Sequence, residues 1–419
     1  MTTFSLRDGA LHAEDVPLSS IADRFGTPCY VYSRSAILQA WDEFARASAH
    51  RRVLVCYALK ANSNLAVIDL LARQGAGFDI VSAGELQRVI AAGGKASRTV
   101  FSGVGKSAPE IRLALELGVR CFNVESQAEL SRIQAVAQSM GRKAPVSLRV
   151  NPDVDAGTHP YISTGLRENK FGIAHDEALA AYDYARSLSH LDVVGIDCHI
   201  GSQITSLSPF TAALDKVLEL VDALHARGIA LAHIDLGGGL GISYDDEQPP
   251  ARSALLAAVF DRLDAHPRGS SYELMFEFGR SIVGNAGVLL TRVEYLKRNG
   301  DRHFAIVDAG MNDLMRPALY EAWHGVEPVK PRLGPVERYD IVGPVCESGD
   351  WLARARELAL AEGDLLAIMS AGAYGMAMSS NYNTRPRAAE VMVEGSRVHL
   401  IRERESIASL FALEKRLAD

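Results

Sequence analysis

Dense apolar runs alternate with amphipathic windows along most of the chain, and this alternation predicts its architecture. Eight runs have the unbroken apolar character of strands covered on both faces; they span residues 53–59, 77–81, 98–102, 120–124, 145–150, 191–199, 231–236 and 272–278. A helical window follows each of the first seven runs, as LAVIDLLARQ does after the first. Eight β/α units within about 250 residues predict a (β/α)8 barrel of the α/β class. A doubly wound open sheet is the alternative, because counting strands does not show closure.

The pattern changes after Asn285, where short β-like runs separated by turns replace the helical windows. The runs are GVLLTRVEYLKR, HFAIVDAG, RYDIVGPVC, DLLAIMSAG and AAEVMVEGSRVHLI. Residues 1–25 contain two strand-like fragments around a turn at Arg7-Asp8-Gly9. The predicted domains are therefore a barrel over residues 26–285 and a β-rich domain built from residues 1–25 and 286–419.

Composition and charge favour small-molecule chemistry. The 419 residues carry a formal net charge of −7 without a long basic run, which argues against nucleic acid or an anionic membrane as partner. The charged N-terminal stretch does not resemble a signal peptide, and no apolar run reaches the length of a membrane span. The five cysteines are scattered without metal-binding spacing, so we expect a cytoplasmic protein that binds no metal.

Lys60 is the first candidate for chemistry, because it directly follows the apolar run VLVCYAL. At the end of a buried strand a lysine is partly desolvated, which disfavours its charged form. The neutral amine is the species that attacks an aldehyde to form a Schiff base. A surface lysine that opens an ordinary loop would have the same local sequence.

Further polar residues and glycines stand at the ends of the other predicted strands, which is where a barrel builds its active site. They are Asp79, Arg149, His199, Ser202, the turn Gly237, Gly238 and Gly239, and the group Glu277, Gly279 and Arg280. Residues without Cβ let backbone N–H groups approach an anion such as phosphate, and Ser202 and Arg280 are suited to bind the same group. The glycine turn is equally compatible with a tight turn that binds nothing.

His199 and Glu277 each fit one requirement of an aromatic cofactor. A histidine can stack on the ring, and a carboxylate beside a pyridine nitrogen keeps that nitrogen protonated and electron-withdrawing. A histidine buried in the core and a Glu277–Arg280 pair are the structural alternatives. An amine, a phosphate site, a stacking ring and an acid for a ring nitrogen are together what pyridoxal phosphate requires, so this cofactor is predicted.

The chain also resembles the fold-type III pyridoxal-phosphate decarboxylases, and among them the bacterial diaminopimelate decarboxylases. Segments that carry the resemblance run nearly end to end and include YALKANSN, GAGFDIVSAGEL, CHIGSQI, DLGGGLGI, GRSIVGNAG, VGPVCESGDWLA and GAYGMAMSSNYNTRPRAAEV. The resemblance implies a barrel with a β-rich domain that contributes substrate and dimer contacts. It also implies a homodimer with shared active sites.

Residue roles follow from the resemblance, position by position. Lys60 would carry the cofactor, His199 would stack on its ring and Glu277 would contact the pyridine nitrogen. The phosphate would be held by Ser202, Gly237, Gly238, Gly239 and Arg280, with Tyr374 nearby. Substrate would be bound by Arg280, Arg316, Tyr320, Glu347 and Tyr374. Cys346, from the partner subunit, would protonate the α-carbon after carbon dioxide leaves. A surface arginine and a small core cysteine are the alternatives for Arg316 and Cys346.

Arginines and a glutamate among the substrate residues fit a far end that carries both a carboxylate and an ammonium group, as in meso-diaminopimelate. The predicted reaction is therefore its decarboxylation to L-lysine. A decarboxylase for ornithine, lysine, carboxynorspermidine or a carrier-bound glutamyl group is the alternative, followed by an amino-acid racemase and a non-catalytic binding protein.

Two further features concern the local geometry of the site, namely Phe278 and the stretch 154–164. The family usually has proline in the motif EPGR, where this chain has Phe278, and the change is expected to affect the geometry of the turn. The glycine-containing stretch 154–164 after the fifth strand is a candidate lid.

Overall fold

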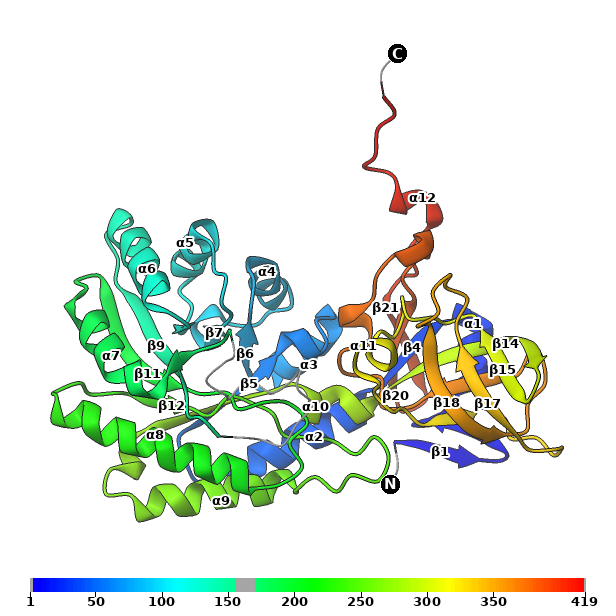
Figure 1. Cartoon of the computed structure of the whole chain (residues 1–419), viewed down its shortest axis with the longest axis horizontal. Helices are drawn as coiled ribbons and strands as arrows, with labels where there is room; N and C mark the ends of the chain where they lie inside the picture. The colour runs from blue at the N-terminus through cyan, green and yellow to red at the C-terminus, as the bar shows by residue number, and fades with distance from the viewer. Residues whose placement is uncertain (1–2, 155–169, 418–419) are drawn as a thin grey trace. The chain divides into compact units, whose positions relative to one another are not determined.

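The structure is a computed structural model that describes residues 3–154 and 170–417 (Figure 1). It contains two compact units, which are described separately. One comprises Ala40–Ile242 and Gln248–Ser281, and the other comprises Met1–Gln39, Ser243–Glu247 and Ile282–Asp419. The candidate lid at residues 154–164 lies, except for its first residue, outside the described part of the chain.

The first unit is a closed parallel barrel. Its strands are β5 (Val53–Ala58), β6 (Gly77–Ile80), β7 (Thr99–Phe101), β8 (Cys121–Val124), β9 (Ala144–Asn151), β11 (Leu191–Asp197), β12 (His233–Asp235) and β13 (Glu273–Phe278). Each strand pairs in parallel with the next, and β13 pairs with β5 to close the ring. A short strand, β10 (Ile173–Ala174), adds to β9. The predicted barrel is thus confirmed and the open sheet is excluded.

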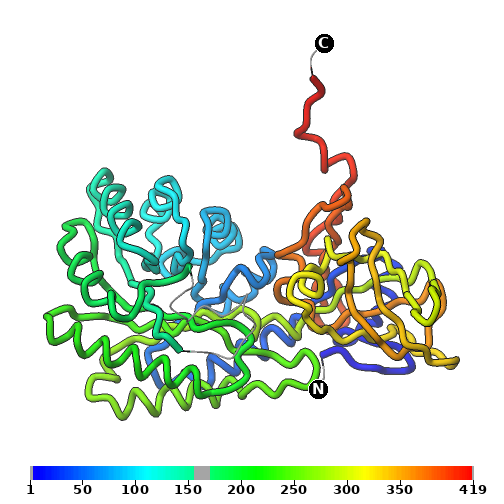
Figure 2. The backbone as a smooth tube through the Cα atoms, in the orientation of Figure 1, coloured from blue at the N-terminus to red at the C-terminus, as the bar shows by residue number. Residues whose placement is uncertain are grey.

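Helices follow the strands as predicted and lie outside the ring, a path that Figure 2 traces. They are α3 (Leu65–Arg73), α4 (Ala83–Ala91), α5 (Ala108–Leu117), α6 (Gln127–Ser139), α7 (Ala178–Ser187), α8 (Ser208–Ala226) and α9 (Arg252–Ala265). Side chains that follow the strands cap the N-termini of three of these helices. Asn64, Ser82 and Ser126 accept hydrogen bonds from first-turn N–H groups of α3, α4 and α6. These caps fix each helix start close to the strand end, where the candidate site lies.

The second unit is β-rich, as predicted. Its main sheet has the order β18 (Trp351–Leu358), β17 (Glu337–Val342), β15 (Arg302–Val307), β14 (Gly287–Asn299), β4 (Cys29–Ser33), β20 (Ala389–Glu394) and β21 (Arg397–Arg402). β19 (Leu365–Ile368) pairs with β14 and with β16 (Val326–Pro328). A hairpin of β1 (Phe4–Arg7) and β2 (Ala10–Ala13), extended by β3 (Val16–Pro17), turns at Asp8 and Gly9, as the sequence predicts. Short helices α1 (Leu18–Phe25), α11 (Arg316–Tyr320) and α12 (Ile407–Leu410) complete this unit.

The N-terminal boundary of the barrel differs from the prediction. Residues 26–39 were expected to belong to the barrel, but β4 pairs with β14 and β20 in the β-rich sheet. The five residues of β4, CYVYS, are all buried. From the sequence alone, this largely apolar run cannot be distinguished from a barrel strand. Helix α2 (Arg34–Ser48) then leads to β5.

Across residues 3–154 and 170–417, the helices are all too short or too polar to cross a membrane.

Candidate active site

Lys60 lies two residues beyond the buried β5, in a single 3-10 turn (Leu59–Ala61). Its ammonium group donates a hydrogen bond of 2.9 Å to Asp79 Oδ2 at the end of β6. The Asp79 side chain is fully buried and that of Lys60 is 38% exposed. The predicted half-buried amine is therefore present, and Asp79 holds it in place.

Glu277 lies near the end of β13 and is held by Asn123 of β8 and by Ser102, which directly follows β7; neither strand pairs with β13. The Asn123 side chain donates to Glu277 Oε1 over 2.9 Å, and the Ser102 hydroxyl donates to the same oxygen over 3.3 Å. Asn123 also donates to Ser102 over 3.2 Å, which fixes the three side chains relative to one another. Sequence reasoning missed Asn123 and Ser102, although both lie at strand ends, where polar residues are informative.

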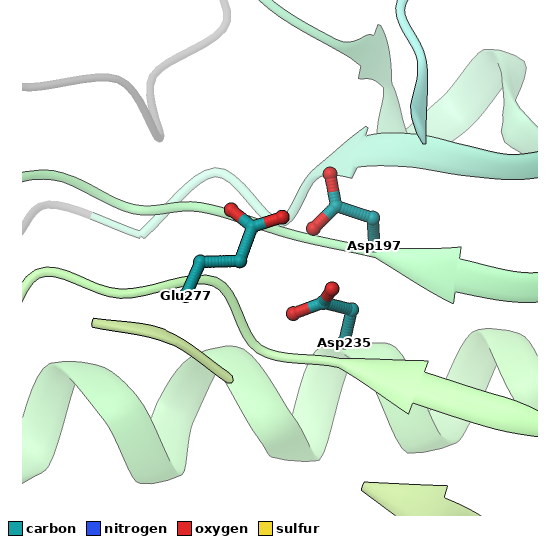
Figure 3. Close-up of side chains that lie close together, drawn as sticks. All are labelled: Asp197, Asp235 and Glu277. Atoms are coloured by element: carbon teal, nitrogen blue, oxygen red, sulfur yellow. The ribbon is translucent and has the colours of Figure 1, made fainter. Parts of the chain in front are cut away.

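Two further carboxylates, Asp197 and Asp235, lie beside Glu277 (Figure 3). One oxygen of each of the three groups lies within 4.8 Å of the others, and all three side chains are buried. Burial and the neighbouring acids Asp79, Asp235 and Asp197 raise the pKa of Glu277 well above its usual value. Burial raises the pKa of Asp235 to about 7, and Asp79 contributes. Such a cluster attracts a cation, either a metal ion or a protonated nitrogen.

Unsatisfied oxygen atoms point to the same conclusion. Asp79 Oδ1, Asp197 Oδ1 and Asp235 Oδ2 are buried and have no hydrogen-bond partner among the described residues. A buried carboxylate oxygen without a hydrogen-bond partner is costly, so the site favours a positively charged group. The prediction did not include Asp197 and Asp235, although they are the last residues of β11 and β12, where polar residues are informative.

His199 is neutral. Burial lowers the pKa of its imidazole well below the usual value, and the charges of Arg149 and Lys60 lower it further. Its Nδ1 accepts a hydrogen bond of 3.1 Å from the backbone N–H of Gly238, so the ring proton is on Nε2. A neutral ring with a fixed orientation can stack on an aromatic cofactor without adding charge.

The three glycines after β12 are required by close backbone packing. A Cβ on Gly237 would lie 2.7 Å from His199 Nδ1, and one on Gly238 would lie 2.2 Å from the carbonyl oxygen of Glu277. Gly237 and Gly239 also have positive φ values of 62° and 105°. The turn thus brings β11, β12 and β13 together, whether or not it also binds phosphate. Gly279 is similarly confined, since its Cβ would lie 2.8 Å from that of Ala61.

Two arginines of the barrel have defined partners. Arg280 donates a hydrogen bond of 2.9 Å to the Ser202 hydroxyl, so the two residues predicted to hold one phosphate are in contact. Arg149 forms a buried ion pair of 3.0 Å with Glu125. Burial lowers the pKa of Arg149, but Glu125, Asp197 and Glu277 outweigh this, and the guanidinium remains charged.

Phe278, in the position where the family has proline, is a core residue. Its ring stacks on Phe44 at 4.2 Å between centroids and also lies against Phe276. Its backbone pairs with Tyr57 of β5 as the last residue of β13. The strand therefore continues regularly to Gly279, which precedes the short helix α10 (Arg280–Val283).

The remaining predicted site residues belong to the β-rich unit. They are Arg316 and Tyr320 at the two ends of α11, Cys346 and Glu347 between β17 and β18, and Tyr374 after β19. Cys346 is exposed, and its backbone N–H donates to Asn383 Oδ1 over 2.8 Å. Tyr374 has a positive φ of 56°, a conformation uncommon for a residue with a side chain. Arg316 is buried.

Comparison with known proteins identifies the family. Residues 34–284 match the family model for the pyridoxal-binding domain of pyridoxal-dependent decarboxylases. The chain belongs to this family. It is 62% identical over 417 residues to the diaminopimelate decarboxylase of Pseudomonas aeruginosa and 57% identical over 412 residues to that of Vibrio cholerae, with at least 98% of each chain covered.

Solved structures of decarboxylases agree with this assignment. The diaminopimelate decarboxylase of Helicobacter pylori in complex with L-lysine is 44% identical, with a TM-score of 0.91 and coverage of 95% of this chain and 99% of the other. The diaminopimelate decarboxylase of M. jannaschii in complex with L-lysine is 39% identical, with a TM-score of 0.94 and coverage of 99% of this chain and 98% of the other. The resemblance inferred from the sequence is thus confirmed. Pyridoxal phosphate is the family's cofactor, and its cationic ring nitrogen fits the unsatisfied carboxylates.

The buried acid cluster should make the stability of the apoprotein depend on pH. Because the pKa of Asp235 is raised from 3.8 to about 7, the folded state binds more protons than the unfolded state between these values. Its free energy of unfolding should therefore fall as the pH rises through this window. In Asp235→Asn the fall should be smaller, and the apoprotein should be more stable than wild type above about pH 7.

Urea unfolding of both apoproteins across this pH range measures the effect. Asp261→Asn is the matched control, because Asp261 is an exposed acid on helix α9 of the barrel. If the free energy of unfolding falls equally steeply with pH in wild type and Asp235→Asn, the proposed cost of burying these acids is contradicted.

Proposed function

We propose that this chain decarboxylates meso-diaminopimelate to L-lysine and carbon dioxide with pyridoxal phosphate bound to Lys60. The observation that carries the proposal is the arrangement of Lys60 and Glu277 on one barrel, with buried carboxylates beside Glu277 that each have an oxygen without a hydrogen-bond partner among the described residues. The cofactor, when bound, supplies an electron-withdrawing ring that accepts the electron pair left when carbon dioxide departs. The chain has to orient the substrate and control the protons.

The residues of the barrel have separate roles in this proposal. Lys60 binds the cofactor aldehyde covalently, and Asp79 orients its amine. Glu277, held by Asn123 and Ser102, keeps a proton on the ring nitrogen. His199 would contact the face of the cofactor ring. Ser202, Arg280 and the backbone N–H groups of Gly237, Gly238 and Gly239 would hold the phosphate, and Tyr374 is proposed to contribute to the same site. Arg149 and Gly279 shape the same site.

Positively and negatively charged residues are proposed to select the substrate. Arg316 and Arg280 bind a carboxylate at the far end of the substrate, and Glu347 binds the ammonium group there, while Tyr320 and Tyr374 line the site. Fixing the far end orients the reacting carboxylate relative to the cofactor ring, which decides the bond that breaks. Ornithine and lysine lack the far carboxylate and would leave an arginine unpaired.

The active enzyme is proposed to be a homodimer with shared sites. The partner subunit's Cys346 donates the proton to the α-carbon after carbon dioxide leaves, and Glu347 comes from the same loop. All five cysteines are free thiols, which fits a reducing cytoplasm.

Product analysis tests the proposed function. With added pyridoxal phosphate, the protein should release carbon dioxide and L-lysine from meso-diaminopimelate, and should turn over L-lysine, ornithine and carboxynorspermidine at least about a hundredfold less efficiently in kcat/KM. Faster release from any of these, or racemisation without loss of carbon dioxide, would contradict the proposal. A racemase is disfavoured because Glu277 at the ring nitrogen makes a strong electron sink.

A further inference from the structure

Two buried side chains that contact Arg316, those of His324 and Tyr244, have no role in the proposed function. Within the β-rich unit, Arg316 Nη1 lies 2.8 Å from His324 Nε2, and the Arg316 guanidinium lies 4.4 Å above the ring of Tyr244. The rings of Tyr244 and His324 meet edge to face at 5.2 Å. All three side chains are less than a tenth exposed. Arg316 thus contacts a hydrogen-bond acceptor and an aromatic face.

The hydrogen bonds fix the protonation state of His324. A guanidinium has only donors, so His324 Nε2 must be the acceptor. The second ring nitrogen, Nδ1, lies 2.8 Å from the carbonyl oxygen of Met369 and therefore carries the proton and donates. His324 is a neutral imidazole that bridges the backbone after β19 to the guanidinium of Arg316.

We propose that His324 is a positioning residue that selects the substrate by holding Arg316 oriented for the far carboxylate. This inference rests on the substrate role proposed for Arg316. A free arginine side chain loses rotamer freedom when it binds a carboxylate, and a side chain oriented beforehand does not lose it again. Binding of a substrate with this carboxylate is thereby favoured over binding of a simple diamine. Tyr244 supports the other side of the guanidinium through its ring.

Two substitutions of His324 separate its two hydrogen bonds. Asparagine places its amide near Nδ1 and keeps the bond to Met369, but it does not reach Arg316. Glutamine reaches the position of Nε2 and keeps an acceptor for Arg316. For meso-diaminopimelate, His324→Asn should raise KM on the order of tenfold with kcat changed less than about twofold, and His324→Gln should recover most of the loss.

A double-mutant cycle with Arg316→Ala shows whether the effect passes through Arg316. In that background, His324→Asn should change KM by less than about twofold. Inhibition by L-lysine, which has a carboxylate, should weaken in His324→Asn, whereas inhibition by cadaverine, which has none, should not. Val326→Ala is the packing control, because Val326 is a buried residue close in sequence that should affect stability and not KM. KM does not depend on the amount of folded enzyme, so partial unfolding does not mimic the effect.

The outcomes distinguish this inference from the proposed function. If Arg316→Ala raises KM but His324→Asn does not, or raises it equally in both backgrounds, His324 does not position Arg316. Equal KM values for His324→Asn and His324→Gln would also overturn the inference. If Arg316→Ala itself leaves KM unchanged, the substrate role of Arg316 is wrong, and the inference about His324 falls with it.

Discussion

Replacement of Lys60 by alanine is expected to abolish covalent binding of the cofactor and to lower kcat/KM on the order of 10⁴-fold, the scale of losing a covalent catalytic group. Lys60 is the amine that follows β5, and Asp79 orients it over 2.9 Å. Alanine keeps the short 3-10 turn but provides no nucleophile. The loss is measured as carbon dioxide release from meso-diaminopimelate and as loss of the visible absorbance of the bound cofactor.

Lys216→Ala is the matched control for this experiment. Lys216 is a helix-surface lysine, 49% exposed and paired with Glu219, and its removal should change kcat/KM by less than about twofold. An active Lys60→Ala enzyme that retains the cofactor absorbance would show that another group binds the aldehyde.

Replacement of Cys346 by alanine is expected to keep the cofactor absorbance and to lower kcat by roughly 10²- to 10⁴-fold, the range for a general acid. The thiol is exposed in the β-rich unit, and the proposal assigns it the protonation of the α-carbon in the partner's site. Cys346→Ser should be intermediate, because a hydroxyl is a weaker acid in the same position. Full activity of Cys346→Ala would remove the assignment.

Mixed subunits test whether Cys346 acts across a dimer. In a mixture of equal amounts of Lys60→Ala and Cys346→Ala chains, about half of the dimers are mixed, and each mixed dimer has one complete site. The mixture should therefore recover about a quarter of wild-type activity after the subunits exchange. A mixture as inactive as its components would show that both residues act in the site of one chain.

The sequence predicted the barrel well because a strand covered on both faces needs an unbroken apolar run. All eight predicted barrel strands are present, with ends shifted by a few residues. The assignment of residues 26–39 was wrong for the same reason: the apolar run of β4 has the same pattern, although it pairs with β14 and β20. Local pattern does not specify which sheet buries a strand.

The charged candidates at strand ends were also predictable, because the topology brings the ends of parallel strands together. Lys60, Asp79, His199 and Glu277 required only this rule. The contacts among the supporting residues did not follow from it. Asp197 and Asp235 are the last residues of β11 and β12, but the rule does not show that their carboxylates gather around Glu277 or that the donation of Asn123 to Glu277 joins β8 to β13. His324 lies eight residues after Arg316, and only the fold of the β-rich unit shows that the two side chains meet.

Reduction of the holoenzyme with borohydride, followed by peptide mass mapping, tests the central claim most directly, since it locates the covalent link between chain and cofactor. The account predicts the reduced cofactor on the peptide that contains Lys60, and the same treatment of Lys60→Ala should leave every peptide unmodified. A cofactor attached to another lysine, or a Lys60 peptide of unchanged mass in active enzyme, would contradict the account.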